Sequence, residues 1–185
     1  MTFDDWISEQ ADAIRNLKGQ TVRKFIATEM AFREADGDNP HQFTDPALPF
    51  LQVCPLYMIL ATGRIVEFTT CENDDTGCTW GMYRNPDPRQ SEPELDAASN
   101  DSIFRTRELG TFPTGEISAV GVALDSWGDI AEVTLDFSGD TILLVSGEVY
   151  ENTNGTFDII EGDESILLFR DPKQKDKVKF SDTVT

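Results

Sequence analysis

The sequence predicts a mainly β fold of the α+β class: an antiparallel meander sheet with an N-terminal amphipathic helix packed on it. Three observations support this prediction. Segments with strand character recur along most of the chain, glycine-containing turns separate them, and one segment near the N-terminus has helical periodicity. At 185 residues the chain can bury a sizeable core. We expect a single domain over residues 1–172, followed by a basic tail over 173–185 that either pairs with the acidic surface or frays.

The first predicted element is a helix over residues 3–18. Thr2 is a suitable N-cap, and Asp5, three residues later, completes a capping box. Lys18-Gly19 is typical of a helix end. The apolar residues at helical spacing are Phe3, Trp6, Ile7, Ala13, Ile14 and Leu17. We expect this apolar face to lie on the sheet.

The first half of the chain alternates strands with polar loops. Thr21–Phe32 fits a helix face or a strand, and its β-branched and aromatic residues favour the strand. Ala35–Pro49 is rich in turn residues, so we expect a loop. Pro55–Thr70 predicts a hairpin that turns at Thr62-Gly63. An acidic turn then leads to a short strand over Cys78–Tyr83.

The second half contains the clearest strand pattern. Asn85–Asp101 has three prolines and no apolar periodicity, which predicts a long exposed loop. Short strands are expected at Ser102–Arg107 and Glu116–Leu124. Asp129–Pro172 then predicts a meander of four strands joined by short turns that contain glycine. The four strands end at Phe137, Tyr150, Ile160 and Phe169.

Charge is the unusual property of the composition. The chain has 15 basic and 34 acidic residues, a net charge of −19, and the segment from Glu108 to Glu164 contains 13 acidic residues without a Lys or Arg. Such a field repels nucleic acid and anionic membranes, and it attracts a basic protein at long range. We therefore expect a protein partner and neither direct nucleic-acid binding nor membrane binding. Acidity that serves only solubility is the alternative reading.

The sequence favours a reduced, cytoplasmic protein. No apolar run approaches the roughly 20 residues that span a bilayer, and the N-terminus lacks the features of a signal peptide. The chain has an odd number of cysteines, Cys54, Cys71 and Cys78, so we expect buried thiols and no disulfide framework. Their spacing does not match a zinc knuckle, and the only histidine, His41, is distant in sequence. We expect no metal.

Motifs for catalysis are missing from the sequence. A single histidine leaves one candidate base, no nucleophile elbow surrounds a serine, and no glycine-rich phosphate loop occurs. We therefore expect no enzymatic activity, no catalytic residues and no cofactor. The adjacent carboxylates Asp74 and Asp75 keep one alternative open, a hydrolase that uses a carboxylate-held metal.

A resemblance to a known class of proteins covers roughly Phe104–Asp171. The stretch FRTRELGTFPTGEISAVGVALDSWGDIAEVTLDF, followed by LLVSGEVYE and GDESILLFRD, resembles the small acidic immunity proteins of bacterial polymorphic-toxin and contact-dependent growth inhibition systems. The resemblance implies a cytosolic, non-catalytic protein that binds a cognate toxin domain, often a basic nuclease, and blocks its active site or its access to substrate. Members of this class differ in structure, so no binding residue is transferred by position.

The candidate partner-binding residues are therefore chosen by charge and side-chain type. Carboxylates on a rigid β scaffold suit a cationic cleft, and tryptophans suit apolar anchors. The candidates are Glu72, Asp74, Asp75, Trp80, Trp127, Glu132, Asp136, Glu148, Glu151, Asp163 and Glu164. A second function remains open from the same electrostatics: an acidic DNA mimic or regulator that occupies a nucleic-acid-binding protein.

Overall fold

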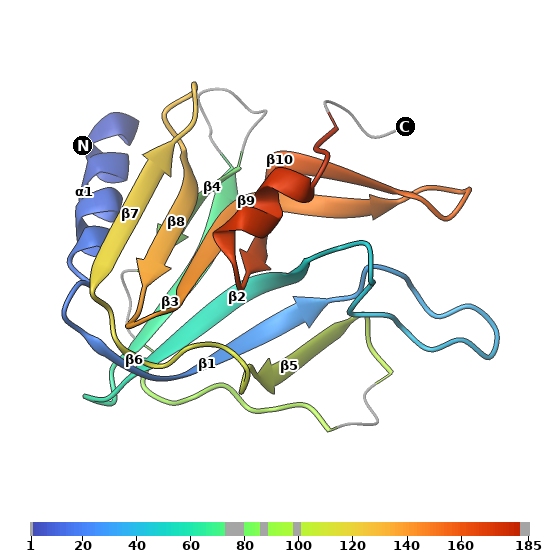
Figure 1. Cartoon of the computed structure of the whole chain (residues 1–185), viewed down its shortest axis with the longest axis horizontal. Helices are drawn as coiled ribbons and strands as arrows, with labels where there is room; N and C mark the ends of the chain where they lie inside the picture. Colours follow the sequence, from blue (N-terminus) through green and yellow to red (C-terminus); the bar gives the residue numbers. More distant parts are fainter. Residues whose placement is uncertain (1, 73–79, 86–88, 98–100, 182–185) are drawn as a thin grey trace.

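The computed structural model describes residues 2–72, 80–85, 89–97 and 101–181, with the side chain of Trp80 left out. It confirms the predicted fold class. A curled antiparallel sheet with the shape of a half-barrel carries the N-terminal helix α1, Phe3–Arg15, on its side (Figure 1). No helix in these parts of the chain has the length and apolar character needed to cross a membrane.

The start of α1 confirms the predicted capping box. The Thr2 hydroxyl accepts a hydrogen bond from the Asp5 amide at 3.2 Å, and the Asp5 carboxylate accepts one from the Thr2 amide at 2.9 Å. The helix ends at Arg15, earlier than predicted, with Asn16 as its C-cap. Gly19, at a φ of 81°, then turns the chain into the first strand.

Ten strands of the described chain join in one sheet. Its main path runs β4-β3-β2-β10-β9-β8-β7, and β1 pairs with β2, β5 and β6. The strands are β1 (Thr21–Met30), β2 (Phe50–Leu60), β3 (Ile65–Glu72), β4 (Trp80–Arg84), β5 (Phe104–Glu108), β6 (Gly115–Glu116), β7 (Ala119–Leu124), β8 (Ile130–Asp136), β9 (Thr141–Glu151) and β10 (Phe157–Phe169).

Three further predicted boundaries are wrong. β2 begins at Phe50 and passes through Pro55, where a register shift in its pairing with β1 accommodates a residue that has no amide donor. The segment Glu116–Leu124 is divided between β6 and β7. The predicted meander of four strands has three, because Phe157–Phe169 is one strand interrupted by a bulge.

The first core cluster fills the inside of the curled sheet. Its largest fully buried side chains include Phe25, Phe68 and Met58. Helix α1 contacts both β4 and β7, and so covers the gap between the two ends of the main strand path. The Trp6 and Tyr83 rings lie 5.6 Å apart across this contact.

A second core cluster lies on the opposite face of the sheet. Successive side chains of a strand point to opposite faces, so Leu143 and Val145 of β9 belong to this cluster, whereas Leu144 belongs to the first. The 31–49 loop and the C-terminal tail cover it, the tail through Val178 and Phe180. The tail contains the short 3-10 helix η1, Pro172–Lys177, and is packed on the sheet.

Candidate functional site

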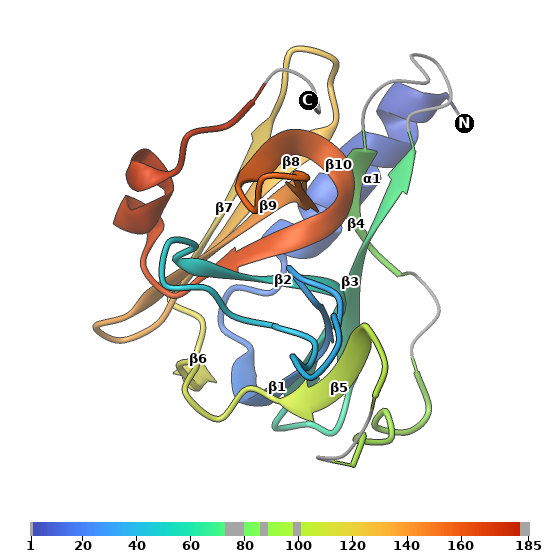
Figure 2. The ribbon, with the colours of Figure 1, turned by 90° about the vertical axis from the view of Figure 1, so that its right-hand side faces the viewer.

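A bulge in β10 organises the acidic residues of the second half of the chain. The pairing of β9 with β10 runs up to Glu161 opposite Gly147 and resumes at Ile166 opposite Ser146. The four residues Gly162–Ser165 therefore have no counterpart on β9. The extra length makes β10 arch over its neighbours, as Figure 2 shows. Asp163 and Glu164 lie in this arch.

The arch needs a glycine in the strand beside it. A Cβ atom added to Gly147 would lie 2.5 Å from the carbonyl oxygen of Ile160 and 3.1 Å from Cδ1 of Leu167. The closer of the two is a backbone atom that belongs to the sheet, so it has little freedom to move. Gly147 therefore permits the close approach of β9 and β10 just before the bulge.

Glu148 lies buried beneath the arch, with 4% of its surface exposed. The Ser165 hydroxyl donates a long hydrogen bond of 3.5 Å to its carboxylate. Burial, the largest cause, and the charges of Glu164 and Asp163 together raise the pKa of Glu148 to about 7, while the Ser165 hydrogen bond acts in the opposite direction. Its expected place among exposed contact residues is thus corrected, because β9 passes under the arch at this point.

Hydrogen bonds fix the arch to its neighbours. The Tyr150 hydroxyl donates to Oδ2 of Asp163 at 2.9 Å, and Oδ1 of Asp163 accepts from the Glu164 amide at 2.8 Å. The Thr70 hydroxyl on β3 donates to the carbonyl oxygen of Glu164. Glu72, which is exposed, follows Thr70 by two residues on the same face of β3. We call Glu72, Asp163 and Glu164 the acidic arch.

An exposed apolar tip lies at the same end of the molecule. Trp127 and Leu124 have 61% and 50% of their surfaces exposed, at the turn between β7 and β8. Asp125 holds this turn, since its Oδ1 accepts hydrogen bonds from the amides of Trp127 at 2.8 Å and Asp129 at 3.0 Å. Figures 1 and 2 both place the turn on the upper side of the molecule, with the arch of β10 below it. Trp127 is therefore an exposed candidate rather than a core residue.

Comparison with known proteins adds no information on function. No family model matches the chain. No curated protein and no solved structure matches it either. The resemblance to immunity proteins stays a prediction.

Three of the other candidates have partners within the molecule. Glu132 forms an ion pair with Lys175 of η1, and Glu151 forms one with Arg33. Asp136 accepts a hydrogen bond of 2.7 Å from the Thr141 hydroxyl. Their internal partners distinguish these carboxylates from those of the arch, so the structure does not present all the predicted contacts as one uncompensated patch.

Three further candidates are described in part or not at all. Asp74 and Asp75 lie outside the described residues. The metal site suggested for the hydrolase alternative therefore also lies outside them. Trp80 begins β4 opposite Glu72, and nothing is described of its side chain. Among the residues that the structure describes, no group of three or more His, Cys, Asp or Glu side chains is placed to hold a metal ion.

The sequence interpretation missed the polar groups that support the arch. Three different strands supply Thr70, Tyr150 and Ser165. Thr70 and Tyr150 donate hydrogen bonds to residues of the arch, and Ser165 donates one to Glu148 beneath it. Their contacts depend on β10 lying next to both β2 and β9, an order that strand periodicity does not specify. The only local signal is the pair of polar residues that flank Gly147 within an apolar run.

Proposed function

We propose that this protein is a cytoplasmic immunity protein that binds a cognate basic toxin domain, such as a nuclease, and covers its active site or its substrate-binding surface. The acidic arch and the Trp127 tip are the proposed docking surface. The observation that carries the proposal is the set of carboxylates in the arch that have no cation beside them. Glu72, Asp163 and Glu164 take part in none of the ion pairs of the described residues, whereas Glu132, Glu151 and Glu161 do.

Uncompensated carboxylates on a rigid support suit fast capture of a cationic protein. Complementary potentials raise the association rate, and the effect weakens as salt screens the charges. The arch is held by hydrogen bonds to β3 and β9, so little ordering would be needed when a partner binds. Tryptophan is among the residue types that most often contribute strongly to binding, and the exposed Trp127 lies at the same end of the molecule as the arch. We therefore expect the acidic arch to raise the association rate and Trp127 to lower the dissociation rate.

Co-purification from the native host, followed by mass spectrometry of the retained proteins, tests the proposal. We expect a one-to-one complex with a basic domain that is toxic when expressed alone, and loss of that toxicity when this protein is expressed with it. A retained protein that binds nucleic acid but is not toxic would overturn the immunity assignment and favour the DNA-mimic alternative.

A matched pair of variants tests the docking surface. Glu72→Gln combined with Glu164→Gln removes two exposed charges of the acidic arch. Glu116→Gln combined with Asp140→Asn removes two exposed charges elsewhere and leaves the net charge the same. We expect the first pair to slow association with the toxin domain at low salt by about tenfold, and the second to have a much smaller effect. Equal effects of the two pairs would show that the arch is not the docking surface.

A further inference from the structure

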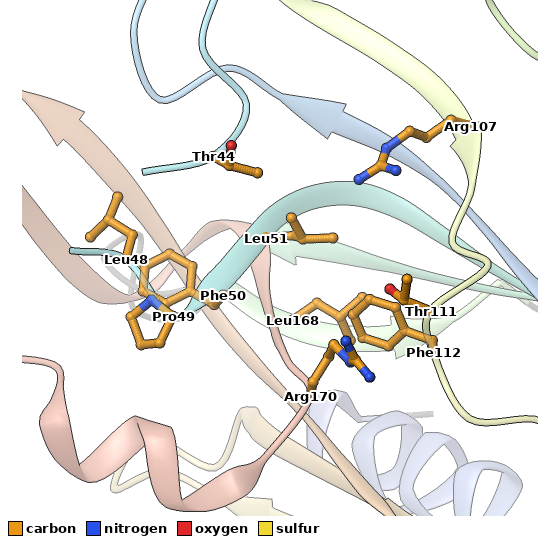
Figure 3. A pocket seen from close by; sticks show the side chains of 10 residues that line it. All are labelled: Thr44, Leu48, Pro49, Phe50, Leu51, Arg107, Thr111, Phe112, Leu168 and Arg170. Carbon is orange, nitrogen blue, oxygen red and sulfur yellow. The ribbon is translucent and has the colours of Figure 1, made fainter. Parts of the chain in front are cut away.

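A cavity of about 320 Å³ is lined by side chains from both core clusters (Figure 3). Its lining is apolar and basic, unlike the acidic arch. Leu51 and Leu168 line it on the side of the first cluster, and Leu48 and Phe50 on the side of the second. Its volume lies within the range of small-molecule sites, which are about 300–1,000 Å³ and mainly apolar. Among the described residues that line it, none is acidic.

Two arginines face this cavity in a protein with a net charge of −19. Figure 3 shows the Arg107 and Arg170 side chains on opposite sides, with Leu51 and Leu168 between them. The buried Glu29 carboxylate, 1% exposed, accepts hydrogen bonds from Arg107 and also forms an ion pair with Arg105 at 2.7 Å. One negative charge is thus shared by two guanidinium groups, and the local charge stays positive.

Arg107 is held in place and still has donors to offer. Its Nε and Nη2 atoms donate to Glu29 at 2.5 and 2.8 Å. A guanidinium carries five N–H donors, so three remain for a ligand. The bonds to Glu29 also orient the planar group, which reduces the entropy lost when a ligand binds.

Arg170 supplies the second guanidinium and has more freedom. It is exposed at the end of β10, and none of the ion pairs of the described residues involves it. Its guanidinium carbon lies 5.8 Å from the centre of the Phe112 ring, which also lines the cavity. Thr44 and Thr111 add hydroxyl groups at the rim. Arg170 has no carboxylate partner among the described residues, and its single positive charge matches a ligand with one negative charge.

We propose that this cavity binds a small organic carboxylate with an apolar body, the carboxylate at Arg170 and the body on the leucine and phenylalanine side chains, with Arg107 adding positive potential from the opposite side. A guanidinium matches a carboxylate through two parallel hydrogen bonds. The site is independent of the proposed toxin binding, because it shares no residue with the acidic arch.

An NMR titration of the isotope-labelled full chain with phenylbutyrate tests the proposal. We expect saturable shifts at Leu51, Phe112 and Leu168. Phenylbutyramide, which has the same shape without the charge, and acetate, which has the charge without the apolar body, should each bind about tenfold more weakly or not at all. Equal binding of the amide, or shifts that map to another part of the sheet, would overturn the proposal.

Three variants assign the binding to this cavity. Arg170→Gln should weaken phenylbutyrate binding about tenfold, whereas Lys173→Gln, an equal change of charge at an exposed residue that does not line the cavity, should leave it unchanged. Thr111→Trp, at an exposed position of the rim, should fill the cavity and abolish binding with the fold intact. Unchanged affinity in Arg170→Gln, or an equal loss in Lys173→Gln, would refute the proposal.

Discussion

Glu148 is a carboxyl group that the fold keeps away from water and close to two other acids. Its folded-state pKa of about 7 lies above the usual 4.5, so the folded chain binds more protons than the unfolded chain between these values. Stability should therefore fall as the pH rises through this window and stay lower above it. Glu148→Gln removes the titrating group. We expect the variant to be more stable than the wild type at pH 8, by on the order of 2 kcal/mol, and similar to it at pH 5.

Urea unfolding at the two pH values measures this effect. Glu116→Gln, a substitution of an exposed glutamate, serves as the control and should follow the wild type at both. A wild type that gains stability relative to Glu148→Gln between pH 5 and pH 8 would contradict the proposed environment of this carboxyl group.

Substitution of Gly147 tests whether the close approach of β9 and β10 requires a glycine. Gly147→Ala should destabilise the protein by roughly 1–3 kcal/mol, since the new methyl group overlaps the Ile160 carbonyl oxygen and the strands must move apart. Gly121→Ala is the matched control, because a Cβ at that strand position lies 3.4 Å from the nearest atom, in ordinary contact. The midpoints of urea unfolding compare the two variants. A control that loses as much stability as Gly147→Ala would show that the close approach is not the cause.

Substitution of Trp127 is expected to change toxin binding without changing the stability of the fold. Trp127→Ala should leave the unfolding free energy nearly unchanged because the side chain is 61% exposed, and it should speed dissociation of a bound toxin domain by about tenfold or more. Surface plasmon resonance measures the dissociation rate. Leu95→Ala, at another exposed apolar residue, is the control. An unchanged dissociation rate would remove Trp127 from the docking surface.

At the scale of elements, the sequence predicts which segments are strands better than where they stop. Period-two alternation identifies β8, and an apolar run on both faces identifies β9, because each face of β9 contacts one of the two core clusters. A bulge and a turn both use glycine and acidic residues, so Glu161-Gly162-Asp163 is indistinguishable from a turn and β10 appears divided. Pro55 similarly hides the first half of β2, although a register shift in its pairing with β1 accommodates it there.

The 3-10 helix η1 is joined to the sheet by the ion pairs of one of its side chains, Lys175. Lys175 forms ion pairs with Glu132 of β8 and Glu161 of β10, and its ammonium lies 5.3 Å from the centre of the Phe180 ring. Lys175→Met should speed amide hydrogen exchange in residues 172–181 with less than about 1 kcal/mol lost from global stability, since these pairs are partly exposed. Lys173→Met, at an exposed residue, is the control and should not change the exchange.

At the scale of the whole molecule, the net charge of −19 predicts a specific salt dependence. The association rate with a basic toxin domain should fall by at least about tenfold between low and physiological salt, whereas the dissociation rate should change little. Stopped-flow or surface plasmon resonance at several ionic strengths measures both rates. Capture that is independent of salt would contradict steering by the acidic surface.

The composition predicts the sign of the surface field but not its distribution. Arg33 and Lys175 neutralise some of the acidic residues from parts of the chain that are distant in sequence, and Glu148 is withdrawn from the surface. The acidic arch is what remains around Gly162–Ser165. Its position depends on three-dimensional contacts between β3, β9 and β10, which no count of charges contains.

The central place of β10 has a consequence for synthesis on the ribosome. Residues 166–169 pair with residues 50–53 on one side and with β9 on the other, so β10, which is synthesised after the other nine strands of the described sheet, joins two halves of that sheet. Until then the edge of β2 has no neighbour at this position, and an open strand edge on a nascent chain is a site for chaperones and for aggregation. The described sheet is therefore completed only after β10 has been synthesised.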